Sequence, residues 1–289
     1  MIRNIYEWTL RQLSNFFNSI QSIIFVLVFS KFKIDKYTKQ NEQCIFMGNG
    51  PSLKDLLEKN LEFIKNKDIF VSNDFAKTKE FLEVKPNNYV IADPAYFNKT
   101  ISKEINDRVE LVYKSLNNVD WNITIYVPHK FEKIIRQRII NKNIIIKSFN
   151  HIQIKGYWFL VFFLLKYRLG MPRVQNVLVA ILSIAINLKY EKIFLWGAEH
   201  SWMKYIVVNS KNQVCVEDHH FFSDKNKKHE PKVLWYNKDD TTRNMEQVLI
   251  DFSRMFKGYY ILEKYATINN VKIINQTPGS LIDAFDRDN

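Results

Sequence analysis

Short apolar segments of strand length alternate along this chain with segments of helical spacing, and most of the apolar segments end in polar residues or a turn. Continuous apolar strands are typical of a parallel sheet buried on both faces, because the connecting helices cover those faces. The alternation therefore predicts an α/β fold, with a mainly parallel, Rossmann-like sheet and helices on both sides. The predicted strands cover residues 43–47, 68–74, 88–94, 123–128, 192–197 and 271–278, and the predicted helices cover 53–64, 174–188 and 242–265.

The composition sets the domain count and disfavours some function classes. With 289 residues, 46% of them hydrophobic, the chain can bury one large core, so we expect one domain over 43–289 after a separate segment over 1–42. The net charge of +12 suits an anionic partner, but zinc-finger spacing, an RNP signature and an arginine-rich helix are all absent from the sequence, so nucleic acid is not expected. Two cysteines form no disulfide framework and no signal peptide is evident, so the expected compartment is the cytoplasm.

The segment over residues 2–29 carries apolar side chains at close to helical spacing, which predicts an amphipathic helix. Its densest apolar part, IIFVLVF, is shorter than the roughly 20 residues that a spanning helix needs, and four lysines follow between residues 31 and 39. This pattern fits a helix in the interface of an anionic membrane, and the alternative is a helix packed on the domain or on a second copy of the chain. A second aromatic segment, 156–170, lies between basic residues and suits either a membrane interface or a buried helix. The expected location is peripheral, on the inner face of the cell membrane.

The sequence GNGPS at residues 48–52 follows the first predicted strand and precedes a helix. Glycines let a backbone approach a ligand closely, and free amide hydrogens at a helix N-terminus attract an anion. We therefore expect Gly48, Asn49, Gly50, Pro51 and Ser52 to bind the phosphate and ribose of a nucleotide. The motif is neither a Walker motif nor a full dinucleotide motif, and an ordinary tight turn is the alternative.

The motif GNGPSL resembles the opening motif of the bacterial sialyltransferases of glycosyltransferase family 42, which use a CMP-sugar donor. Further likenesses follow in order in DIFVSNDF, YVIADPAYF, PRVQNVLVAILSIAINLKYEKIFLWG and INQTPGSLIDAF. The resemblance implies a sialyltransferase-like fold, with nucleotide contacts from Asn73, Thr277, Gly279 and Ser280. It covers residue 44 to the C-terminus in pieces. A wider group that includes pterin-diphosphokinase-like proteins shares the opening motif.

The chain departs from the family pattern at several positions. Asp93 stands where the family's third strand has an asparagine, and Gln175-Asn176 stands where the family has a Ser-Gly pair. We expect Asn73 and Asp93 to bind the base or the donor sugar, and Arg173 to support the departing phosphate. The family's catalytic histidine cannot be aligned with one in this chain, so the base and the donor sugar can both differ from those of the sialyltransferases.

Residues 197–222 hold three of the six histidines, close to Glu199 and other acidic residues. His200 follows a predicted strand and is the first candidate for a general base that takes a proton from the acceptor hydroxyl, with His219 and His220 next. A divalent-metal site is another interpretation, but the spacing matches no known metal motif, and no metal ligand is assigned. The third interpretation is that these residues belong to a loop and only make local hydrogen bonds. Tyr205 could support the leaving phosphate, as a tyrosine pair does in the family.

These features predict an inverting glycosyltransferase that moves a sugar from a nucleotide-sugar donor to a surface glycan or glycolipid, as in lipopolysaccharide biosynthesis. The expected donor is CMP-linked sialic acid or another ulosonic acid, and no cofactor is expected besides this donor. The sequence is compatible with a homo-oligomer. Two alternatives remain, a diphosphotransferase acting on a small alcohol and a non-catalytic membrane-bound component of a polysaccharide assembly complex.

Overall fold

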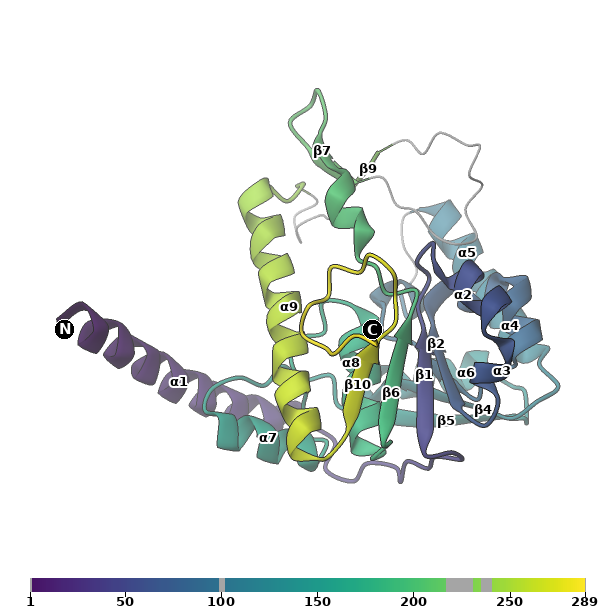
Figure 1. Cartoon of the computed structure of the whole chain (residues 1–289), viewed down its shortest axis with the longest axis horizontal. Coiled ribbons are helices and arrows are strands. Elements are labelled where there is room, and N and C mark those ends of the chain that lie inside the picture. The colour runs from purple at the N-terminus through teal and green to yellow at the C-terminus, as the bar shows by residue number, and fades with distance from the viewer. Residues whose placement is uncertain (1, 99–101, 217–230, 235–240, 289) are drawn as a thin grey trace.

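The central sheet of the computed structural model has seven strands, all parallel, as the sequence pattern predicts (Figure 1). The structure describes residues 2–98, 102–216, 231–234 and 241–288. Across the sheet the strands are ordered β10-β6-β1-β2-β3-β4-β5. Their bounds are β1 (Gln43–Met47), β2 (Asp68–Ser72), β3 (Asn88–Val90), β4 (Ile123–Pro128), β5 (Ile144–Phe149), β6 (Lys192–Trp196) and β10 (Lys272–Asn275).

Both faces of the sheet are covered by helices, because successive side chains of a strand point to opposite faces. Cys44 and Phe46 of β1 belong to one hydrophobic cluster, and Ile45 and Met47 belong to the other. The first cluster includes side chains of α7 (Trp158–Lys166), α8 (Val177–Asn187) and α9 (Met245–Ile268). The second includes side chains of α2 (Leu53–Lys59), α3 (Leu61–Ile64), α4 (Lys79–Val84), α5 (Lys103–Asn117) and α6 (Glu132–Arg138).

The remaining elements lie around this core. The long helix α1 (Ile2–Phe29) precedes the sheet, and its N-terminal part projects away from the rest of the molecule (Figure 1). Short 3₁₀ helices follow four of the strands: η1 (Asn73–Lys77), η2 (Pro94–Tyr96), η3 (His129–Phe131) and η4 (Ser201–Tyr205). A small antiparallel sheet follows η4 and consists of β7 (Ile206–Val208), β8 (Val214–Val216) and β9 (Lys232–Val233).

The strand order places a topological switch at β1. The chain runs outward from β1 through β2, β3 and β4 to β5, and then returns to place β6 on the other side of β1. Connections on the two sides of such a point leave in opposite directions and open a crevice at the carboxyl ends of the strands. The switch therefore lies where the Gly48–Ser52 turn follows β1.

Several boundaries differ from the sequence prediction. The predicted helix over 53–64 is broken at Asn60, whose side-chain amide donates to the carbonyl oxygen of Leu56 at 2.9 Å and so competes with helical bonding. The strand predicted over 68–74 ends at Ser72, because Asn73 has a φ of +52° and begins η1. The fifth strand, β5, and the helices α4, α5 and α6 were not predicted from the sequence pattern.

The segment between α1 and β1 is packed against the sheet. Tyr37 donates a hydrogen bond to the carbonyl oxygen of Ser148 at 2.9 Å, and its ring meets the ring of Tyr126 edge-on. The amide of Gln40 donates to the buried carboxylate of Asp68 at 2.9 Å. A division between segment 1–42 and domain 43–289 stays a prediction.

Candidate functional site

A cavity of about 170 Å³ opens at the topological switch, at the carboxyl ends of β1, β2 and β6. Four segments contribute to its wall: the glycine turn, the end of β2, the start of α8 and the loop after β6. Its lining residues are Phe46, Gly48, Asn49, Gly50, Pro51, Ser72, Asn73, Asn176, Val177, Leu178, Gly197, Ala198, Glu199, His200, Ser201 and Trp202. The cavity thus gathers the glycine turn, Asn73 and His200, which the sequence predicts as site residues.

The glycine turn is bonded to the neighbouring strand β6. The amide of Gly48 donates to the carbonyl oxygen of Trp196 at 2.8 Å, and the amide of Gly50 donates to that of Gly197 at 2.9 Å. A β-carbon on Gly48 would lie 2.2 Å from the carbonyl oxygen of Gly197, so only glycine permits this approach. The amides of these two glycines are therefore occupied, and the predicted nucleotide contacts of the turn stay predictions.

Glu199 occupies the position at the start of α2 that was predicted for a phosphate. Its Oε1 atom accepts a hydrogen bond from the backbone amide of Ser52 at 2.6 Å. Its backbone carbonyl accepts from the amide of Leu281 at 2.9 Å, and the residue is 5% exposed. A carboxylate beside a helix N-terminus is stabilised by the amide hydrogens there, as a phosphate would be. The sequence prediction did not select Glu199, although its place three residues after β6 was a usable signal.

The cavity is surrounded by side-chain oxygens that lack partners. Among the residues that the structure describes, eight buried side-chain polar atoms have no hydrogen-bond partner, and five of the eight belong to this site. Four are on lining residues and the fifth is on Ser52, beside Pro51; they are Asn49 Oδ1, Asn73 Oδ1, Asn176 Oδ1, Glu199 Oε2 and Ser52 Oγ. Buried polar groups without partners are costly, and their convergence on one cavity indicates a ligand that completes them.

His200 is held by a short polar chain behind the cavity. The side-chain amide of Asn176 donates to the hydroxyl of Tyr259 at 2.5 Å, and that hydroxyl lies 2.7 Å from Nε2 of His200. If Nε2 donates to the Tyr259 hydroxyl, Nδ1 carries no proton and keeps a lone pair that can accept one. Burial lowers the pKa of His200 to about 4, so its imidazole is neutral at pH 7. Its φ of +55° places it in the left-handed region at the start of η4.

The predicted residues Asp93, Arg173 and Tyr205 lie outside this cavity. Asp93 accepts a hydrogen bond from the amide of Ala95 at 2.9 Å and caps η2 at the end of β3. Arg173 lies 3.5 Å from the carboxylate of Asp251, on α9. Tyr205 is at the exposed end of η4. None of the three is among the lining residues, so the structure does not bring them to the glycine turn.

The predicted residues of the C-terminal turn support the loop that carries Glu199. The hydroxyl of Thr277 accepts from the amide of Ala198 at 3.1 Å, and the hydroxyl of Ser280 donates to the carbonyl of Ala198 at 2.7 Å. Both side chains are buried, whereas Gly279 is exposed with a φ of +64°. In this geometry Thr277 and Ser280 position the loop after β6, and their predicted nucleotide contacts stay predictions.

Two further candidates, His219 and His220, lie outside the described residues. Within the described part of the chain, His, Cys, Asp and Glu side chains do not gather in any group of three or more that could hold a metal ion. No residue of the cavity is therefore assigned to a metal.

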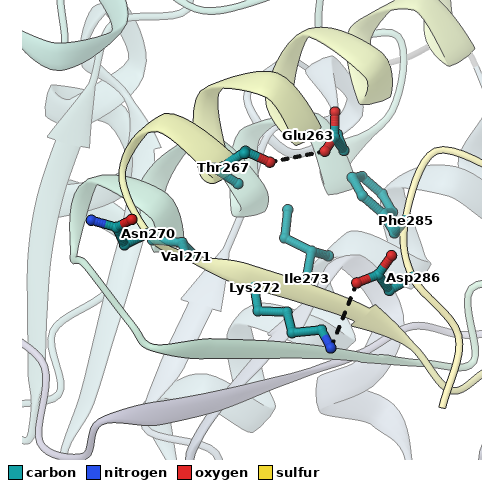
Figure 2. A pocket seen from close by; sticks show the side chains of 9 residues that line it. Glu263, Thr267, Asn270, Val271, Lys272, Ile273, Phe285 and Asp286 are labelled. Atoms are coloured by element: carbon teal, nitrogen blue, oxygen red, sulfur yellow. Dashed lines mark hydrogen bonds and ion pairs between the residues drawn. The ribbon is translucent and has the colours of Figure 1, made fainter.

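A second hollow of about 380 Å³ lies between the end of α9 and the start of β10 (Figure 2). Four of its polar side chains pair with one another, since Thr267 donates to Glu263 at 2.9 Å and Lys272 lies 3.6 Å from Asp286. It is at the amino end of β10, opposite to the edge where parallel sheets bind ligands. We therefore place the candidate site at the cavity beside Glu199.

Comparison with solved structures finds a likeness to the MAf glycosyltransferase from Magnetospirillum magneticum AMB-1, with 10% sequence identity and a TM-score of 0.49. The match covers 90% of this chain and 35% of that protein, so this chain spans about a third of its length. No protein-family model matches the chain, and a search of curated proteins finds no match. At this similarity the comparison does not define the reaction, and the function has to be argued from the cavity.

Proposed function

We propose that this chain is a glycosyltransferase that binds a nucleotide-sugar donor in the cavity at the β1 switch. The observation that carries the proposal is the set of unpartnered oxygens of Asn49, Asn73, Asn176 and Glu199 around that cavity. These atoms accept hydrogen bonds, so the matching ligand is rich in hydroxyl and amino hydrogens. A ribose, a sugar and the exocyclic amino group of a base all present such donors.

The electrostatics of the turn favour the sugar or nucleoside, and not the phosphate, as the group beside Glu199. A phosphate next to this carboxylate would bring two negative charges together. The backbone amide of Asn49 is the place for the phosphate, because it has no hydrogen-bond partner among the described residues, whereas those of Gly48 and Gly50 are occupied. The donor would then lie with its phosphate toward Asn49 and its hydroxyls toward Glu199 and Asn176.

The transfer step follows from this placement. The acceptor hydroxyl oxygen forms a bond to the anomeric carbon from the side opposite the nucleotide, the bond from that carbon to the phosphate oxygen breaks, and the nucleotide leaves with the electron pair. The proton of the acceptor goes to a general base. His200 is the first candidate, since it is a neutral imidazole that lines the cavity, and Glu199 is the second, since Oε2 has no partner among the described atoms.

We propose a CMP-linked ulosonic acid such as sialic acid as the donor and a glycan or glycolipid as the acceptor. The support for CMP is the resemblance of the sequence around Gly48, Asn73 and the C-terminal turn to the bacterial sialyltransferases. Calorimetry with CMP, CDP, UDP, GDP and magnesium-ATP tests the nucleotide. Binding of CMP and CMP-sialic acid, with release of CMP in the presence of a glycan acceptor, is the expected result. Binding of magnesium-ATP alone would replace this proposal with the diphosphotransferase.

Site variants connect nucleotide binding to the cavity. Asn73→Ala and Asn49→Ala each remove an acceptor oxygen from the wall, and we expect each to weaken CMP binding by about two- to tenfold, since such a hydrogen bond contributes roughly 0.5–1.5 kcal/mol. Asn122→Ala, at an exposed position before β4, is the matched control and should bind as the parent does. Equal affinity of all three folded variants would place the nucleotide elsewhere.

A further inference from the structure

Helix α1 has the reverse of the usual arrangement for a helix on a water-soluble domain. Its packed face carries small or polar residues at heptad-like spacing, namely Gln12, Asn15, Ser19, Ser22 and Val26. Its outward face carries large apolar side chains, namely Ile5, Tyr6, Trp8, Leu10, Leu13, Phe16, Phe17, Ile20, Ile23, Ile24, Phe25, Leu27, Val28 and Phe29. A helix in contact with water hides such residues, so another apolar phase must cover them.

Hydrogen bonds hold the polar face of α1 to the loop before α7. The hydroxyl of Ser22 donates to the carbonyl of Lys155 at 2.8 Å, and the hydroxyl of Ser19 accepts from the amide of Tyr157 at 3.0 Å. Gly156 has a φ of +121°, and a β-carbon there would lie 2.2 Å from Oγ of Ser19. The close contact therefore depends on Gly156 and fixes which face of α1 is turned outward.

Helix α7 adds to the same apolar surface. Only part of it is buried, and Trp158, Phe159, Phe163 and Tyr167 are exposed, with Phe159 at 74%. Figure 1 shows α7 beside the C-terminal part of α1. Aromatic side chains with a polar edge, such as Trp158 and Tyr167, are enriched where a protein meets the headgroups of a bilayer.

The charges around this surface favour an anionic bilayer as the occupant. Residues 12–29 contain no charged residue. Lys33 and Lys36 follow α1, Lys166 ends α7, and the ammonium group of Lys264 lies 4.5 Å from the centre of the Trp158 ring. Cations at the border of an apolar surface attract anionic headgroups. We propose that the outward faces of α1 and α7 form one membrane-docking surface that lies in the interface of an anionic bilayer.

The arrangement of α1 supports docking in the membrane plane. Within the described residues, α1 is the one helix long and apolar enough, by length and composition, to cross a bilayer. Its C-terminal half, however, is bonded along its side to the domain through Ser19 and Ser22, and Ser30, the residue after the helix, donates to the carbonyl of Leu169 at 2.5 Å. A helix whose C-terminal half is held lengthwise on the domain presents one face of that half to lipid, as interfacial helices do. This surface lies outside the candidate site, and the inference does not depend on the proposed reaction.

Vesicle flotation of the full-length protein tests the proposal. Vesicles of phosphatidylcholine with phosphatidylglycerol should carry the protein upward, and pure phosphatidylcholine vesicles should carry less of it. The double variant Phe17→Glu/Phe163→Glu places one carboxylate on each helix and should lower the partition coefficient at least tenfold. Leu82→Glu, at an exposed position on α4, is the matched control and should float as the parent does.

Three results would overturn the inference. One is flotation of the folded double variant, checked by circular dichroism, as efficient as that of the parent. The other is a stable dimer in sedimentation without lipid that the double variant converts to a monomer, together with unchanged vesicle binding, which would show that a second copy covers the surface. Protection of the N-terminus from protease by the vesicle interior would show a spanning helix and would equally contradict docking in the plane.

Discussion

The carboxylate of Glu199 lies in the space that a side chain on Gly50 would occupy. A β-carbon at Gly50 would be 1.5 Å from Oε2 of Glu199, while Oε1 accepts a hydrogen bond from the amide of Ser52 at 2.6 Å. The absence of a side chain at the second glycine of the turn therefore leaves room for the side chain of Glu199. This relationship links the loop after β6 to the start of α2 and sets the chemistry of the cavity.

Gly50→Ala should destabilise the protein and weaken nucleotide binding. The new methyl group overlaps Oε2 of Glu199 and lies 2.7 Å from the carbonyl oxygen of Gly197, and overpacking of this kind costs about 1–3 kcal/mol. The double variant Gly50→Ala/Glu199→Ala should regain part of the stability, because one of the two clashes is gone. Urea denaturation of the parent, of Gly50→Ala, of Glu199→Ala and of the double variant gives the coupling energy between the two positions. Additive effects would contradict the contact.

Glu199→Gln should separate the two proposed roles of this carboxylate, which are to accept a hydrogen bond from the Ser52 amide and to place a negative charge beside the ligand. A glutamine keeps an oxygen that can accept from the Ser52 amide but removes the charge beside the ligand. We expect the fold to be retained and the affinity for the donor to fall by about tenfold or more, since hydrogen bonds to charged groups contribute about 1.5–3 kcal/mol. Isothermal titration with the donor measures the change. Unaltered affinity would mean that Oε2 does not face the ligand.

His200 should titrate well below the usual range of histidine. Its pKa in the folded protein is about 4 because burial disfavours the imidazolium, whereas an unfolded chain has a value near 6.5. As the pH falls, the unfolded state therefore takes up a proton before the folded state does. The neutral ring of His200 contributes fully to the stability of the folded protein above pH 6.5, and this contribution is lost as the pH falls toward 4. The stability difference between the parent and His200→Asn should accordingly shrink between pH 7 and pH 4. A difference that is constant over this range would contradict the buried neutral ring.

The same value sets the expected pH dependence of transfer. If His200 is the base, activity should persist to about pH 5 and fall only as the ring is protonated near pH 4, and His200→Ala should lower the rate by about 10²–10⁴-fold while donor affinity changes little. Initial rates from pH 4 to 8 measure this. A fall centred on pH 6.5, or full activity of His200→Ala, would assign the base to another group.

Asp68 should be important for stability and distant from catalysis. This carboxylate is fully buried at the amino end of β2 and accepts from the Tyr190 hydroxyl at 2.6 Å, from the Asn87 amide at 2.7 Å and from the Gln40 backbone amide at 2.9 Å. Asp68→Ala leaves these donors without their acceptor, and we expect a loss of about 3–5 kcal/mol in the free energy of unfolding. Asp120→Ala removes an exposed partner of Lys85 and should cost less than about 1 kcal/mol. Similar denaturation midpoints for the two variants would contradict the assigned network.

Strands buried on both faces could be predicted from the sequence because local composition is enough to identify them. β1 and β4 have the predicted bounds, since their apolar runs end at a glycine and a proline. β5, with the sequence IIIKSF, is an edge strand with two partly exposed residues and an exposed one, and it was missed. Asn60 and Asn73 end elements early, because spacing does not reveal the side-chain hydrogen bond of Asn60 or the left-handed backbone of Asn73.

The positions of site residues along the chain were determined by the sequence, whereas their roles were decided by the tertiary structure. Gly48, Asn49, Asn73 and His200 could be selected because polar residues after parallel strands meet at one edge of a sheet. Only the packed chain shows that a carboxylate 147 positions from Ser52 accepts its amide and occupies the start of α2. Likewise, apolar spacing predicted the helix at the N-terminus, but hydrogen bonds of its serines to the loop before α7 decide which face is exposed. Local patterns specify where elements form, while contacts between distant segments specify what each side chain can bind.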